Sequence, residues 1–330
     1  MPIFQFGFMI KHRREELGYT QEDLADGICS VPTLSRIENG ERMPTREHFE
    51  MLIQRLGYSD TMLDVYVDEK QFRLHELKFQ IRQAIILNQL ETAQNLLIEY
   101  ERYIEKPIQI EIQFIILCRT LSDSTAYRPD ERLKILEGAI RLTCPKYEIS
   151  KFPRILSFEE ILILNNIAVC YAQMGNYEPA IGILSHLKQY YENHMMNPEE
   201  VLRTQPLILY NLSKYLGCSS RYDECIEIAD LGIRIARNTG RCSFMDGLLY
   251  NRAWALVRRK RHGDKEAAIL SAKQARSFAL IMEKTDAITL YSSFILNNFP
   301  NETYCSITTS GPSHNVTISK LPWLTGCFAL

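Results

Sequence analysis

One asparagine recurs at the same place in three related parts of the sequence, as Asn166, Asn211 and Asn251. The related stretches span residues 165–181, 210–226 and 250–269, and the third has three extra residues at its turn. An asparagine amide offers two donors and an acceptor, so it can pair with the polar groups of a peptide main chain. If the fold aligns them, three such amides could hold an extended peptide whatever its side chains are.

The elements that must align these amides are helices. From residue 68 to residue 299 apolar residues recur at intervals of three and four, with charges between them. No stretch alternates convincingly as a strand would. The earlier part of this region fits two further helix pairs, 71–88 with 90–105 and 108–123 with 129–143.

The three stretches resemble tetratricopeptide repeats, in which small residues let two helices approach each other and an aromatic residue fills the turn. The first stretch matches this pattern at Ala168, Tyr171, Gly175, Tyr177 and Ala180. The second matches more loosely, at Ser213, Tyr222 and Cys225. The resemblance implies a right-handed helical solenoid whose first helices line a concave face, with the three asparagines in a row along it.

Side chains near these asparagines suggest what else a peptide would meet. Lys214 could pair with a carboxylate, and so could Arg203. Aromatic candidates with an apolar face and a polar edge are Tyr210, Tyr250 and Trp254. An alternative stays open, in which the asparagines bridge neighbouring helices, because a buried amide usually finds a partner.

A second set of residues, from 20 to 40, spells two short helices joined by a tight turn. Thr20 and Ser30 are good N-cap residues, and Gly27 breaks the first helix. Asn39-Gly40 supplies a left-handed end to the second helix. Two helices at this spacing form a helix-turn-helix, which places one helix end in the DNA major groove.

Residues 6–67 resemble the Cro/repressor family of DNA-binding domains, and the turn GICS resembles the Rgg and PlcR branch of peptide-responsive regulators. The resemblance implies a head of five helices. It puts phosphate contacts at Gln21 and Asn39, and it puts Val31, Pro32, Thr33 and Arg36 on the exposed face of the recognition helix. Because Arg36 is the only long donor on that face, its expected partner is a guanine, bound by two hydrogen bonds.

Arg14 and Glu38 match a pair that forms a buried salt bridge in this family, which gives Arg14 a structural role. Residues 1–66 hold seven Lys and Arg residues against eleven Asp and Glu residues, a net formal charge of −4. The head therefore lacks the basic surface of a strong nonspecific DNA binder. We expect affinity for double-stranded DNA to need local basic clusters and two copies acting together, as a homodimer.

The composition is that of a soluble globular protein, with 330 residues, 46% hydrophobic, 24% charged and a formal net charge of −2. No apolar run approaches the roughly 18 residues that a membrane span needs. The nine cysteines show no CxxC or His/Cys metal spacing. No nucleophile elbow or glycine-rich phosphate loop appears. We therefore expect a cytoplasmic protein with no membrane contact, metal site, cofactor or enzymatic activity.

These patterns predict an all-α chain in three parts. The parts are a helix-turn-helix domain at 1–67, a tetratricopeptide-like repeat domain at 68–299 and a low-charge tail at 300–330. The tail ends in the apolar sequence LPWLTGCFAL. It could be disordered, cover the last repeat, or lie in the groove as a peptide would.

The joined parts resemble the RNPP/Rgg regulators of Gram-positive quorum sensing. In that family a short imported peptide binds the repeats and alters how a homodimer presents its two DNA-reading heads. The resemblance implies a transcriptional regulator that binds double-stranded DNA and a short signalling peptide. An alternative is a regulator of the phosphorelay or phage-repressor type, whose repeats bind another protein and no peptide. An enzyme is a third class, without a supporting motif.

Overall fold

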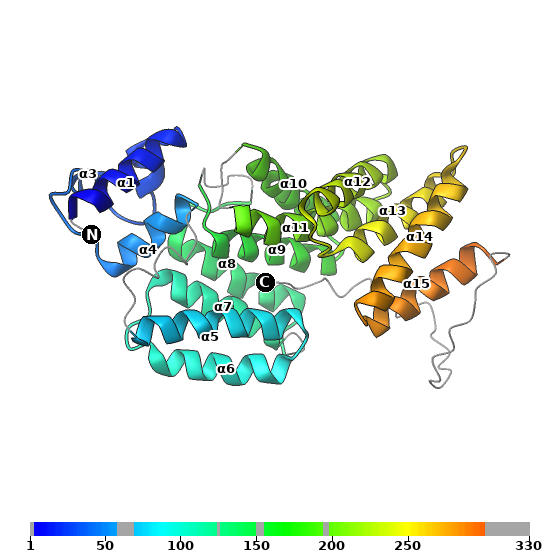
Figure 1. Ribbon diagram of the computed structural model, residues 1–330, viewed down its shortest axis with the longest axis horizontal. Coiled ribbons are helices and arrows are strands. Elements are labelled where there is room, and N and C mark those ends of the chain that lie inside the picture. The colour runs from blue at the N-terminus through cyan, green and yellow to red at the C-terminus, as the bar shows by residue number, and fades with distance from the viewer. Residues whose placement is uncertain (1–2, 58–68, 124–125, 150–154, 194–197, 301–330) are drawn as a thin grey trace.

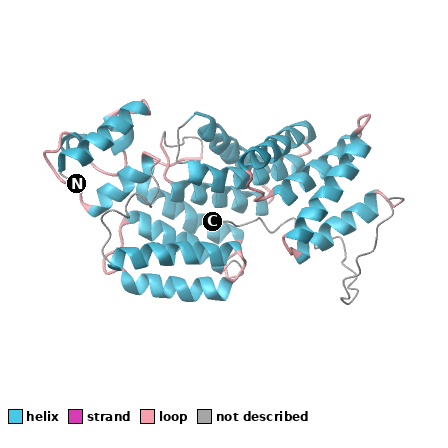
Figure 2. Ribbon diagram, viewed as in Figure 1, coloured by secondary structure: helices cyan, strands magenta, loops and turns pink. Residues whose placement is uncertain are grey.

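The computed structural model describes residues 3–57, 69–123, 126–149, 155–193 and 198–300. Over these residues the chain forms fifteen α-helices joined by short loops and turns (Figure 2). The all-α fold expected from the sequence is confirmed. The tail at 301–330, for which three arrangements were considered, lies outside the described residues.

The first four helices form the DNA head. They are α1 (Ile3–Glu16), α2 (Gln21–Ala25), α3 (Val31–Glu38) and α4 (Arg46–Arg55). Thr20 Oγ1 accepts from the Asp23 amide at 3.1 Å, and the Asp23 carboxylate accepts from the Thr20 amide at 2.9 Å. Ser30 Oγ accepts from the Thr33 amide at 3.3 Å. A fifth helix was expected in this head, but residues 58–68 lie outside the described part of the chain.

A small apolar core holds these four helices together. Fully buried side chains include Ile10 on α1, Leu34 on α3 and Leu52 on α4. Gly7 lets α1 approach the end of α3, because a Cβ at this position would lie 2.2 Å from the carbonyl oxygen of Ile37. The position of α3 is therefore fixed by direct backbone contact with α1.

The remaining helices pair in sequence order, as repeats do. The pairs are α5 (Glu69–Ile86) with α6 (Leu90–Tyr103), α7 (Gln109–Ser122) with α8 (Pro129–Thr143), α9 (Phe158–Gln173) with α10 (Tyr177–Asn193), α11 (Pro198–Cys218) with α12 (Tyr222–Thr239), and α13 (Met245–Arg259) with α14 (Asp264–Ile281), followed by α15 (Thr285–Asn298). Figure 1 shows the head at one end of an elongated array and α14 and α15 at the other.

Helix α9 lies at the centre of this array. Every side chain from residue 158 to residue 170 is buried, including the polar Asn165 and Asn166. The helix contacts α7, α8, α10 and α11. The small Ala168 and Ala180 are fully buried, and Gly175 takes a φ of 82° in the turn between α9 and α10, as the repeat pattern predicts.

Candidate DNA and peptide sites

The recognition helix α3 presents the side chains that the sequence placed on its outer face. Pro32 and Arg36 are exposed, and Val31 and Thr33 are half-buried. Asn39, at the end of the helix, is also exposed. Within the described residues, no hydrogen bond or ion pair holds the guanidinium of Arg36. This arginine is therefore available to a base.

A buried network lies beneath this face. Arg14 Nε donates to Glu38 Oε1 at 2.6 Å, and Arg14 Nη2 donates to Glu38 Oε2 at 3.0 Å. The salt bridge implied by the family resemblance is present. Gln21, expected at a phosphate, donates from Nε2 to Glu38 Oε2 at 2.8 Å and is half-buried. Its amide therefore also fixes α2 against the end of α3.

The three recurrent asparagines are all buried on the first helices of their pairs. Asn211 Nδ2 donates to Asn165 Oδ1 at 2.9 Å, which joins α11 to α9. Asn251 Nδ2 donates to the Tyr210 carbonyl oxygen at 3.1 Å and to Ser213 Oγ at 2.9 Å, which joins α13 to α11. These contacts favour the bridging alternative for both residues.

Asn166 differs from the other two asparagines. Its Nδ2 donates within its own helix to the Leu162 carbonyl oxygen at 2.8 Å, so it bridges nothing. Its Oδ1 is buried without a partner among the described residues, as is the Oδ1 of Asn211. Unsatisfied buried acceptors are rare in folded proteins. Among the three recurrent asparagines, these two side-chain oxygens are therefore the buried acceptors that a ligand could still satisfy.

Two further amides on the repeat helices share this property, and the sequence analysis did not identify them. Asn165 Nδ2 and Gln113 Oε1 are buried and lack a partner in the described part of the chain. Asn165 belongs to the recurring stretch, but the pattern predicts a role for its neighbour Asn166, because Asn166 is the residue that aligns with Asn211 and Asn251. Gln113 lies in the apolar run IQFIILC. A single polar residue in such a run is a sign of a buried polar side chain, and this sign could have identified Gln113.

The other peptide candidates have partners within the molecule. Tyr210 stacks on Phe244 with ring centroids 5.6 Å apart, and Tyr250 stacks on Tyr291 at 4.6 Å. The pKa of Tyr250 is raised by burial. Trp254 contacts Tyr222, with ring centroids 6.0 Å apart, and the guanidinium of Arg258, 3.5 Å from its ring centroid. Lys214 Nζ lies 5.9 Å from the ring centroid of Tyr215.

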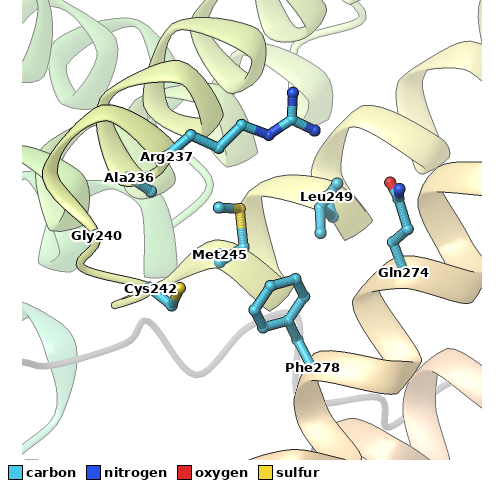
Figure 3. Close-up of a pocket in the computed structure, with 8 residues that line it drawn as sticks. All are labelled: Ala236, Arg237, Gly240, Cys242, Met245, Leu249, Gln274 and Phe278. Carbon is cyan, nitrogen blue, oxygen red and sulfur yellow. The ribbon is translucent and has the colours of Figure 1, made fainter.

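A pocket of about 200 Å³ opens between α12, α13 and α14 (Figure 3). Met245 and Leu249 line it from α13, and Phe278 lines it from α14, with Arg237 at the end of α12. This volume is below the roughly 300–1,000 Å³ of typical small-molecule and cofactor sites. It suits a single apolar side chain.

The described residues contain no group of three or more His, Cys, Asp or Glu side chains placed to hold a metal ion. Among the same residues, none of the helices has the length and apolar character needed to cross a membrane.

Two family models match separate parts of the chain. Residues 10–63 match the helix-turn-helix family, and residues 147–300 match the RNPP family C-terminal domain. None of the curated proteins matches the chain.

Two solved structures share the fold of almost the whole chain. PlcR from Bacillus thuringiensis in complex with the peptide PapR7 and DNA has a TM-score of 0.58 and 20% identity, over 89% of this chain and 99% of that one. The apo form of the same protein has a TM-score of 0.55 and 19% identity, over 90% and 99%. The chain therefore joins a helix-turn-helix domain to a domain of the RNPP family C-terminal type, and the two matches together support a helix-turn-helix regulator of the RNPP type.

Proposed function

We propose that the protein is a cytoplasmic, peptide-responsive transcriptional regulator that reads double-stranded DNA as a homodimer. The observation that carries this proposal is the RNPP C-terminal domain at 147–300 behind a helix-turn-helix at 10–63. The similar fold of B. thuringiensis PlcR was crystallised with a peptide and DNA. We transfer both classes of ligand to this chain. The proposal includes no reaction, so it requires no catalytic group or cofactor.

The peptide is proposed to bind along α9 and α11, the first helices of their pairs. Three unpartnered amide atoms on α9 and α11 support this placement, namely Asn165 Nδ2, Asn166 Oδ1 and Asn211 Oδ1. One donor and two acceptors complement the carbonyl and amide groups of a peptide main chain. The proposal rests on these three atoms more than on Asn251, whose Nδ2 is used by α11.

Binding at these amides would require a conformational change. Asn165, Asn166 and Asn211 are each 0% exposed, so a peptide reaches them only when the surrounding helices separate. The peptide would thus select a more open arrangement of the repeats. A ligand that prefers one arrangement shifts the population toward it, and this shift would alter how the two heads are presented to DNA half-sites.

Replacing Asn166 or Asn211 by alanine should weaken peptide binding by about 0.5–1.5 kcal/mol each, because one or two main-chain hydrogen bonds are lost. Calorimetry with a peptide selected from a synthetic library measures this change. Asn251→Ala is the matched control: like Asn211→Ala, it removes a bridge between two helices and should lower the melting temperature, since the Tyr210 carbonyl and Ser213 lose a donor, but it should leave peptide affinity unchanged. Lower melting temperatures with unaltered peptide affinity in all three variants would instead favour a protein partner for the repeats.

A dimer is expected because a single head is a weak DNA binder. Its net formal charge of −4 over residues 1–66 opposes phosphate binding, and two linked heads gain affinity from binding together. Sedimentation of the purified protein should show a dimer at micromolar concentration, and selected operators should be pseudo-palindromic. A strict monomer that protects a palindromic site would contradict this expectation.

A further inference from the structure

Arg55 makes the central polar contact between the head and the repeats. Arg55, at the end of α4, is only 6% exposed. Its Nη1 donates to the carbonyl oxygen of Asp26, in the turn between α2 and α3. Its Nη2 lies 3.3 Å from the Thr143 carbonyl oxygen and 3.5 Å from Glu160 Oε1. One guanidinium thus joins the helix-turn-helix motif to α8 and α9.

The carboxylate that receives Arg55 is held from several sides. Glu160 accepts from Thr143 Oγ1 and from the Ser157 amide, each at 2.6 Å, and from Cys144 Sγ at 3.1 Å. Burial raises its pKa, but Arg55 and these hydrogen bonds outweigh burial and leave the pKa below its usual value. The carboxylate is therefore ionised at neutral pH and forms a true ion pair with Arg55.

The same contacts continue into the repeats. Gln113 Nε2, on α7, donates to Thr143 Oγ1 at 2.6 Å. A continuous chain of hydrogen-bonded polar groups therefore runs from Gln113 through Thr143, Glu160 and Arg55, all buried, to the carbonyl oxygen of Asp26 at the surface; we call it the buried relay. Its far end lies on α7, where Gln113 Oε1 has no partner among the described residues.

The backbone of the head also lies in close contact with the repeats at this place. Gly27, next to Asp26, has a φ of 71°, and a Cβ there would lie 2.0 Å from the Thr143 carbonyl oxygen. The turn thus packs directly on the end of α8. Lys146 Nζ adds a surface contact to Asp26 Oδ1 at 3.5 Å. The recognition helix α3 begins only a few residues beyond this turn, so the contacts of the turn with α8 fix the direction of the helix.

We propose that Arg55 and Glu160 are positioning residues for DNA reading: their ion pair fixes the angle at which the repeats hold the recognition helix. Buried ion pairs often contribute little net stability but define one arrangement over others. The relay then connects that angle to α7 and α9. This inference rests on DNA binding by the head and is independent of whether the ligand of the repeats is a peptide.

The test uses the full-length double variant Arg55→Met/Glu160→Gln, which removes both charges and keeps similar shapes. We expect a melting temperature near that of wild type and about tenfold faster hydrogen exchange at residues 26–30 and 143–148. Operators selected from a random duplex pool should show a broader range of half-site spacings. The matched control is Arg73→Met/Glu99→Gln, which removes an ion pair within the repeats and should change neither readout.

If the double variant does not fold, Arg55→Lys replaces it in the test. Lysine keeps the charge but lacks the planar guanidinium that reaches three acceptors. It should also show faster hydrogen exchange and a broader range of half-site spacings. Unchanged exchange and an unchanged spacing distribution would overturn the inference. Faster exchange with unchanged spacing would also overturn it, since the pair would then hold the head without setting its direction. If the wild type selected no DNA sequence at all, the proposed function would be contradicted. The exchange data would still show whether Arg55 and Glu160 hold the head against the repeats.

Discussion

Replacing Arg14 by alanine should destabilise the head by about 3–5 kcal/mol, because it leaves the Glu38 carboxylate buried without its cation. The Glu38 side chain is 1% exposed, and Arg14 supplies two of its hydrogen bonds. Arg14 Nη1 also donates to the Tyr19 carbonyl oxygen at 2.8 Å, so this buried acceptor loses the Arg14 donor as well. Hydrogen exchange of α1 to α4 in the full-length chain measures the free energy of opening of the head.

Glu16→Ala is the matched control for this experiment. Glu16 lies on the same helix, is half exposed, and pairs only at the surface with His12 and Arg13. Its loss should change the opening free energy by less than about 0.5 kcal/mol. The double variant Arg14→Met/Glu38→Leu, which removes both charges, should recover much of the lost stability. Equal exchange in Arg14→Ala and wild type would refute a structural role for this salt bridge.

Arg36→Ala should cost about 1–3 kcal/mol on the selected operator and much less on random DNA, because a bidentate contact to guanine distinguishes one base from the others. The exposed guanidinium on α3 has no competing partner among the described residues, so the contact needs no prior rearrangement. Fluorescence anisotropy on both DNAs at one salt concentration measures the two losses.

Arg42→Ala provides the comparison. Arg42 is exposed just beyond α3, outside the face that the sequence assigns to base contacts, so we expect it to meet phosphates. Its loss should weaken binding to both DNAs by similar amounts. If Arg36→Ala also weakened both equally, Arg36 would be a phosphate contact and the assignment of base reading would fall.

Local signals explain what the sequence predicted well. The caps at Thr20 and Ser30 form within three residues of themselves, so their types are enough to predict them. Helix pairing is also local, since apolar periodicity and turn residues mark each helix. The expected pair 108–123 with 129–143 is close to α7 (Gln109–Ser122) and α8 (Pro129–Thr143).

The roles of polar side chains were harder to predict, because their partners lie far away in the sequence. Asn211 meets Asn165 across 46 residues, and Arg55 meets Glu160 across 105. No local pattern encodes such a meeting. Recurrence of the asparagines predicted a shared role at one repeat position, but it could not decide whether their partners are neighbouring helices or a peptide.

The central claim is that a peptide bound to the repeats changes DNA binding by the heads. The most direct measurement is the binding of the selected operator, followed by fluorescence anisotropy, with and without a peptide selected by the protein from a synthetic library. We expect the peptide to change operator affinity by about 5–150-fold in wild type, and by much less in Asn211→Ala. Identical binding curves with and without saturating peptide would contradict the claim.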